Sequence, residues 1–336
     1  MGFIFRLQAE GVAFHVLIAG TTYRIRIRTT PGSSAGSLKI LTGRLGFRFG
    51  MALAAEHDAD LLSKAVKLAK EADYAIIFTS HTEQWETEGQ DQVSFNLPMA
   101  GSQDALVVTS VNPNTIVVNS TGVPVAMPWL DSVAAVVQAW FGGQEAGTSI
   151  VDVLTGAVNP EGHLPVTFPK ELEDAPGYGD FPGYYVDGQP AVEYKEGVFV
   201  GYRHYDRMAK DKVNFPSGHG LSYSTFEYST LEVTKELDDH FSVCVSVKNT
   251  SNITGSTLAQ IYAGLEVSNL THPAKSLVGF AKATLESSKT QTLPLSIPVQ
   301  HLAYFDENNN KWVVASGNYQ FALGRSAAGQ DRRCFC

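Results

Sequence analysis

Two short apolar runs constrain the fold of this chain more than any other feature. They are Ala75–Phe78 and Thr115–Asn119, and a third run, Val133–Trp140, follows the second after a loop. Near-continuous apolar runs of this length are typical of parallel strands that are buried on both faces. The sequence therefore predicts that these runs are strands of one parallel sheet.

Helical patterns alternate with these runs. Apolar residues between Leu61 and Ala72 follow the 3.6-residue period, and Asp58 or Asp60 stands where an N-cap is expected. A second helix fits Glu145–Leu154. Helices and strands that alternate at this pitch form βαβ units. We therefore predict an α/β fold with a mostly parallel sheet flanked by helices.

The segments outside this region have a different pattern. Residues 1–50 contain alternating strands such as Tyr23–Arg28, and residues 156–226 are rich in Pro, Tyr and Gly. We interpret the latter as an ordered connecting segment that lies over the α/β domain. The predicted units are a partial β domain (1–50), an α/β domain with its connecting segment (51–226), an all-β domain (227–326) and a tail (327–336).

The all-β unit has strict alternation of apolar and polar residues, which is the pattern of half-buried strands. One example is the series Phe241, Val243, Val245 and Val247, with Cys244 on the opposite face. About seven short strands in roughly 100 residues are typical of an immunoglobulin-like sandwich.

Composition excludes several classes of partner. The chain has 336 residues, of which 18% are charged, and a formal net charge of -9. An acidic surface argues against nucleic acid and anionic membranes and is compatible with neutral substrates such as sugars. The sequence also lacks an apolar run of the roughly 18 residues that span a bilayer, and its N-terminus lacks a secretory signal pattern.

Cysteines and sequence motifs give little support for a cofactor or a metal. The three cysteines, Cys244, Cys334 and Cys336, form neither a disulfide framework nor a metal-ligand spacing. The serine-hydrolase elbow and the P-loop are absent, and the glycines of Gly218–Tyr223 complete no dinucleotide fingerprint. We therefore predict no cofactor. N-glycosylation sequons begin at Asn119, Asn249, Asn252 and Asn269.

The loop Ser80–Asp91 directly follows the first apolar run and concentrates acidic residues around one tryptophan. They are Glu83, Glu86, Glu88 and Asp91, with Trp85 and Gly89 between them. In open α/β sheets, ligands bind beyond the carboxyl ends of the strands. A tryptophan beside a carboxyl group favours the protonated form that a general acid requires. The alternative is an acidic loop that is only solvated.

A series of motifs in one order makes the chain similar to a known family. The quoted segments are Trp85–Asp91, Asn112–Val118, Pro124–Trp129, Ala139–Gly147, Asp152–Gly156, Gly162–Pro169, Glu196–Asp206 and Phe215–Phe226. Together they resemble the C-terminal part of glycoside hydrolase family 3. Residues 227–326 resemble the fibronectin type III-like domain of that family. Residues 3–50 are similar to the end of its protective-antigen-like β domain.

The resemblance implies a retaining β-glucosidase that acts on β-glucosides or short β-linked oligosaccharides. In such enzymes a barrel supplies an Asp nucleophile, and a loop of the α/β domain supplies the acid/base residue, which corresponds here to Glu88. Trp85 and Asp91 are the implied substrate contacts, although Trp85 also fits a packing role. The resemblance favours an extracellular location, with the cytoplasm as the alternative, and is compatible with a homo-oligomer.

The chain departs from the family pattern at three points. It contains no barrel segment that could supply the nucleophile, so we expect the isolated chain to be inactive. Gln92 stands where the family has Arg, and Thr82 where it has Asn, which puts sugar contacts beside Glu88 in question. The alternatives are a non-catalytic module that binds glycans or a partner, and an ordinary α/β ligand-binding domain.

Overall fold

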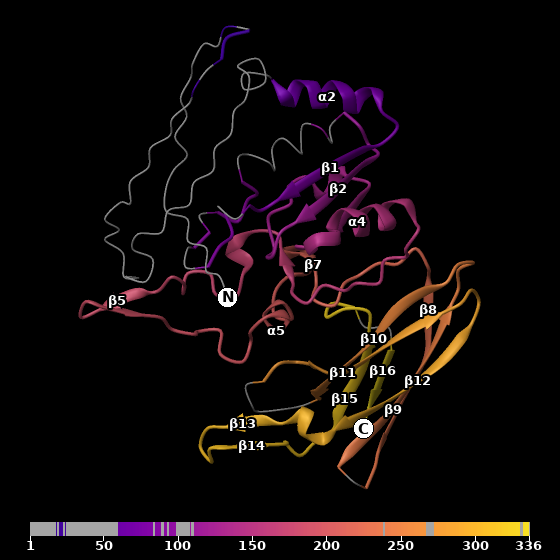
Figure 1. The fold of residues 1–336 in the computed structure, drawn as a ribbon. Coiled ribbons are helices and arrows are strands. Elements are labelled where there is room, and N and C mark those ends of the chain that lie inside the picture. Colours follow the sequence, from indigo (N-terminus) through magenta and orange to yellow (C-terminus); the bar gives the residue numbers. More distant parts are fainter. Residues whose placement is uncertain are drawn as a thin grey trace.

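The structure is a computed structural model with two main parts, a small parallel sheet with helices and an all-β sandwich (Figure 1). It describes residues 18, 20–22, 24, 60–82, 85–88, 91–92, 94–98, 108, 111–237, 239–266, 272–329 and 332–335. The predicted β domain of residues 1–50 therefore lies almost entirely outside the described residues.

The described sheet has three parallel strands in the order β1-β2-β3. They are β1 (Ala75–Ser80), β2 (Thr115–Ser120) and β3 (Ala135–Gln138). Val117 and Val118 of the central strand are both fully buried although they point to opposite faces. The α/β prediction is confirmed.

β1 differs from its prediction as a buried strand. Phe78 is 64% exposed and Ile76 is nearly half exposed, whereas Ala75 and Thr79 are buried. The reason is that Ile76 and Phe78 lie on one face of β1, which is little covered, whereas Ala75, Ile77 and Thr79 lie on the other face, which packs inward. Apolar composition alone does not show whether one face of a strand or both faces are covered.

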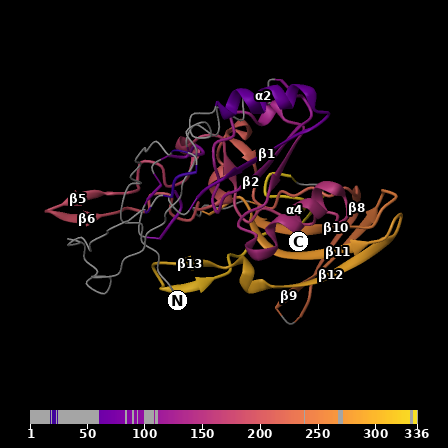
Figure 2. The ribbon, with the colours of Figure 1, turned by 45° about the horizontal axis from the view of Figure 1, so that its top comes forward.

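Two helices flank the sheet on opposite sides in both views (Figures 1 and 2). Helix α2 (Leu61–Glu71) begins at the N-cap Asp60, whose carboxylate accepts a 3.0 Å hydrogen bond from the amide of Ser63. Its buried Ala69 packs against Ala75 at the start of β1. Helix α4 (Ala146–Thr155) ends at Gly156, whose positive φ of 76° suits glycine at a helix C-terminus.

The connecting segment contains short strands and one short helix, and only part of it lies over the α/β domain. Its elements are β4 (Phe168–Pro169), β5 (Tyr184–Val186), β6 (Gln189–Ala191), α5 (Tyr202–Tyr205) and β7 (Val213–Phe215). β4 pairs with β7, and Phe168 is buried beneath the sheet. The β5–β6 hairpin instead projects from the body in both views, and its Tyr185 is 78% exposed (Figures 1 and 2).

Three half-buried histidines of this segment predict that stability depends on pH. Burial lowers the pKa of His163, His204 and His219 below the ordinary value of 6.5. Below pH 6.5 the unfolded chain therefore binds protons that the folded chain does not, and stability falls as the pH drops. We expect a lower melting temperature at about pH 5 than at about pH 7.5, by circular dichroism, and a smaller difference in the double variant His163→Gln/His219→Gln. An unchanged difference would contradict the assignment.

The all-β part is a sandwich of two antiparallel sheets, as predicted. One sheet has the order β12-β9-β8 and the other β11-β10-β15-β16. The strands are β8 (Phe226–Lys235), β9 (His240–Asn249), β10 (Gly255–Leu265), β11 (Ser276–Leu285), β12 (Thr290–Pro298), β15 (Tyr319–Gly324) and β16 (Arg332–Phe335). A further hairpin joins β13 (Tyr304–Asp306) to β14 (Lys311–Val313).

The core of the sandwich follows from the alternation seen in the sequence. Val243, Val245 and Val247 are buried between the sheets, where they meet Ile261 and Phe321 of the facing sheet. The segment predicted as a tail differs from its prediction, since β16 pairs with β15 and completes the larger sheet. The edge of β15 that does not pair with β10 has free backbone groups, to which β16 can hydrogen-bond. A strand of four residues is too short for its side-chain pattern to predict this pairing.

Polar side chains join the two parts. The amide of Asn159 donates to the hydroxyl of Ser224 and to the carbonyl of Thr254, while its oxygen accepts from Ser222 and Tyr223. A second junction is a mostly buried ion pair between Lys275 and Asp206.

Candidate active site

The acidic loop leaves the carboxyl end of β1, as the sequence predicts. The first residue after β1, His81, is fully buried, and its backbone amide donates to Ser120 at the end of β2. The chain then turns sharply, because the carbonyl of Thr82 accepts hydrogen bonds from the amides of both Trp85 (2.8 Å) and Glu86 (2.9 Å). The turn brings Glu86 back to the ends of β1 and β2.

A row of buried and half-buried polar side chains supports the ends of these strands. In register across the three strands lie Thr79, Asn119 and Gln138. The hydroxyl of Thr79 donates to Asn119 Oδ1 (2.8 Å), and Asn119 Nδ2 donates to Gln138 Oε1 (2.7 Å) and to the hydroxyl of Thr121 (2.9 Å). Buried polar groups that are fully hydrogen-bonded fix one arrangement of the strands. This polar row thus sets the position of the strand ends from which the loop starts.

Glu86 is an acidic residue of the loop that is held by specific hydrogen bonds. Its Oε2 lies 2.8 Å from His81 Nδ1 and accepts a 3.1 Å hydrogen bond from the backbone amide of Gly122. Gly122 follows β2, so one carboxylate contacts the ends of two neighbouring strands. The sequence interpretation of this loop assigned Glu86 no role, because its partners lie five and 36 residues away.

The predicted site residues Glu88, Trp85 and Asp91 differ in exposure. Glu88 and Asp91 are exposed. Trp85 is half-buried, with its ring centroid 6.3 Å from that of His81, and its indole nitrogen is buried with no hydrogen-bond partner in the described residues. This contact favours packing as the main role of Trp85. Glu83 and Gly89 lie outside the described residues.

The two positions that depart from the family pattern differ in exposure. Thr82 is exposed, but its carbonyl holds the turn, and Gln92 is half-buried. Any residue type at position 82 can supply that carbonyl, so the turn does not depend on the side chain.

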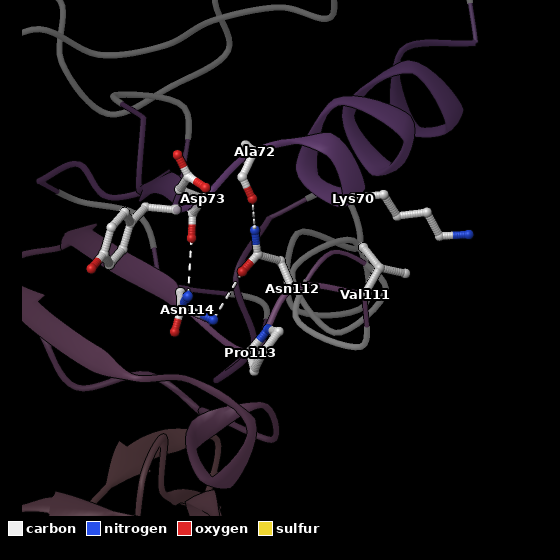
Figure 3. A pocket seen from close by; sticks show the side chains of 8 residues that line it. Lys70, Ala72, Asp73, Val111, Asn112, Pro113 and Asn114 are labelled. Carbon is white, nitrogen blue, oxygen red and sulfur yellow. Dashed lines mark hydrogen bonds between the residues drawn. The ribbon is translucent and has the colours of Figure 1, made fainter.

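A pocket of about 550 Å³ lies at the other end of the strands, where β1 and β2 begin (Figure 3). Its two asparagine side chains already bond to backbone groups around it. Asn112 Nδ2 donates to the carbonyls of Ala69 and Ala72. Its oxygen accepts from the amide of Asn114, and Asn114 Nδ2 donates to the carbonyl of Asp73 (Figure 3). The Asn-Pro-Asn turn is therefore a brace between α2 and β2, and we assign no ligand to this pocket.

Metals and membranes receive no support from the described part of the chain. Within it, no group of three or more His, Cys, Asp or Glu side chains is arranged to hold a metal ion. Among the described helices, none is long and apolar enough to cross a membrane.

Comparison with known proteins assigns this architecture. Residues 14–202 match the model of the glycosyl hydrolase family 3 C-terminal domain. The chain belongs to glycoside hydrolase family 3. Residues 257–327 match the fibronectin type III-like domain, in agreement with the sandwich. The family 3 match begins at residue 14, so it includes much of the segment that we predicted as a separate β domain.

Family 3 relatives cover nearly the whole chain. It is 50% identical over 335 residues to Beta-glucosidase B of Emericella nidulans, a match of 97% of this chain and 40% of that protein. It is 36% identical over 331 residues to the probable beta-glucosidase I of Aspergillus oryzae, covering 95% of this chain and 39% of that protein. The chain thus spans about 40% of the length of these relatives.

Solved family 3 structures have the same fold. The beta-glucosidase from Kluyveromyces marxianus in complex with glucose has a TM-score of 0.77 and 37% identity, with 85% of this chain and 34% of that chain covered. Beta-glucosidase 3B from Thermotoga neapolitana in complex with α-D-glucose has a TM-score of 0.75 and 31% identity, with 89% and 41% covered.

Proposed function

We propose that this chain supplies the acid/base side of a retaining β-glucosidase, with Glu88 as the acid/base residue. The observation that carries the proposal is the position of Glu88. Its carboxylate is exposed two residues after the anchored Glu86, on the loop at the carboxyl end of a parallel sheet, where such sheets bind ligands. The names of the relatives support the reaction, and two solved relatives are complexes with glucose.

In the proposed reaction, two carboxyl groups act on opposite sides of one bond. A carboxylate nucleophile attacks the anomeric carbon while protonated Glu88 donates its proton to the glycosidic oxygen, so that the aglycone leaves as an alcohol. Ionised Glu88 then removes a proton from water, and the water oxygen displaces the nucleophile from the glycosyl-enzyme. Asp91 and the exposed part of Trp85 are the proposed sugar contacts. No metal or cofactor enters either step.

The nucleophile is proposed to come from the part of the longer relatives that this chain does not span. The projecting β5–β6 hairpin supports this proposal. Tyr185 is 78% exposed, and Phe181 and Tyr194 beside the hairpin are also largely exposed, whereas large exposed apolar patches usually mark an interface. We propose that the N-terminal part of the full-length enzyme packs on this hairpin.

Activity measurements on two proteins test this division of labour. We expect the purified 336-residue chain to release no nitrophenol from 4-nitrophenyl β-glucoside. A chimera in which this chain replaces the matching part of Beta-glucosidase B is expected to be active, because the two sequences are 50% identical there. Thermal melts show whether each protein is folded. Turnover by the isolated chain that Glu88→Gln abolishes would contradict the proposal.

A non-catalytic glycan-binding module is the second candidate. It is favoured by one surface feature, the β13–β14 hairpin, on which Trp312 is 70% exposed and contacts Phe305 edge to face. An exposed tryptophan combines an apolar ring face with a polar N–H group, and this combination suits contact with a sugar ring. Calorimetric titration of the isolated chain with glucose and cellobiose, compared with Trp312→Ala, separates the two. Saturable binding that requires Trp312, together with an inactive chimera, favours the module.

We also propose an extracellular location with limited glycosylation. A glycan requires an exposed asparagine amide in the folded protein. Asn119 and Asn249 are fully buried and hydrogen-bonded, whereas Asn252 is exposed. Asn269 lies outside the described residues. Of the described sequons, only Asn252 is therefore compatible with a glycan.

A further inference from the structure

The carboxylate of Glu86 holds the acid/base loop to the ends of two strands. Oε2 faces the imidazole of His81, which directly follows β1, and the amide of Gly122, which follows β2. The Glu86 side chain is only 24% exposed, so most of it is out of contact with water. Hydrogen bonds to an ionised acceptor are stronger than neutral ones.

His81 depends on this contact. Its side chain has no exposed surface, and in the described residues its second ring nitrogen, Nε2, has no hydrogen-bond partner. Glu86 is thus the only polar partner of the ring within the described part of the chain. Loss of that carboxylate would leave both ring nitrogens buried without a partner, which is costly.

Gly122 provides the second half of the clamp. A Cβ atom at position 122 would lie 2.1 Å from Glu86 Oε1 and 3.1 Å from the ring of Phe141. Only glycine therefore lets the carboxylate approach the backbone amide at 3.1 Å. The loop and the end of β2 fit together at this point, although they are 36 residues apart in the chain.

We infer that Glu86 is a positioning residue that fixes the carboxylate of Glu88 through its clamp on His81 and Gly122. The inference rests on the proposed function of Glu88. Two residues of extended chain span only about 6–7 Å, so an anchor at Glu86 restricts where Glu88 can lie. A general acid must stay within hydrogen-bond reach of the leaving oxygen, and misplacement by about 1 Å can cost up to about 100-fold in rate.

The kinetic test uses the active chimera with Beta-glucosidase B and two substrates. For cellobiose, whose leaving group needs a proton, we expect Glu86→Ala to lower kcat/KM by about 10- to 100-fold. Glu86→Gln, which keeps one acceptor oxygen, should lose less. For 2,4-dinitrophenyl β-glucoside, whose leaving group needs no proton, kcat/KM should change by less than about threefold. A merely structural role would lower both values equally, together with the melting temperature.

A measurement on the isolated chain tests the clamp itself. The amide of Gly122 should exchange its hydrogen faster in Glu86→Ala than in the parent chain, and Glu88→Gln should leave that exchange unchanged. Unchanged exchange in Glu86→Ala, or equal losses on both substrates, would overturn the inference while leaving the role of Glu88 intact. If Glu88→Gln itself shows no dependence on the leaving group, the proposed function fails, and the positioning role fails with it.

Discussion

In the chimera with Beta-glucosidase B, Glu88→Gln should lower kcat/KM for cellobiose by about 1,000-fold, because the glutamine cannot protonate the leaving oxygen. For 2,4-dinitrophenyl β-glucoside the same variant should lose less than about tenfold in kcat/KM, since dinitrophenolate leaves without a proton. Initial rates with the two substrates give both ratios. The difference between them measures the contribution of the acid.

The second half-reaction gives an independent check on Glu88. With the activated substrate, Glu88→Gln should accumulate the glycosyl-enzyme, because no base removes a proton from the attacking water. Added azide is an anion that needs no base, so it should restore turnover and yield β-glucosyl azide. Glu71→Gln, at an exposed glutamate of α2, is the matched control and should behave like the parent. Equal losses on both substrates without rescue by azide would exclude Glu88 as the acid/base residue.

Local patterns predicted the parts of the fold that depend on neighbours in sequence. The alternation of Val243, Val245 and Val247 gave the buried face of β9 because side chains of a strand alternate between faces. The run around Val117 gave a strand buried on both faces for the same reason. Asp60 was one of two predicted caps of α2, and its carboxylate does bond to the first turn.

These local patterns did not predict contacts between residues that are far apart in sequence. Glu86 looked like a solvated acidic residue because nothing in its own segment shows that Gly122 approaches it. The exposure of Phe78 depends on what covers its face of β1, and the pairing of β16 depends on the free edge of β15. One signal could have pointed to the clamp. His81 and Glu86 flank a turn at the end of a predicted strand, and a glycine follows the next strand.

The polar row of Thr79, Asn119 and Gln138 below the loop should contribute strongly to the free energy of unfolding. Asn119 is fully buried, and it is the middle member that bonds to Thr79 on one side and Gln138 on the other. Asn119→Leu keeps a similar shape but leaves the Thr79 hydroxyl and the Gln138 carbonyl without those bonds. A buried unsatisfied group costs about 1–3 kcal/mol, and Gln138 is only half-buried, so we expect a loss of roughly 3 kcal/mol.

Thermal unfolding monitored by circular dichroism measures this loss, which should lower Tm by roughly 10 °C for the α/β domain. Asn252→Leu, at an exposed asparagine, is the matched control and should shift Tm by little. The double variant Thr79→Val/Asn119→Leu should recover part of the loss, because it removes one of the orphaned groups rather than adding another. A double variant less stable than Asn119→Leu would show that packing, not hydrogen bonding, sets the cost. Ser120, which holds the amide of His81, directly follows Asn119, and Gly122, which holds Glu86, lies three residues after it. The single variant in the chimera should therefore also lose activity on cellobiose.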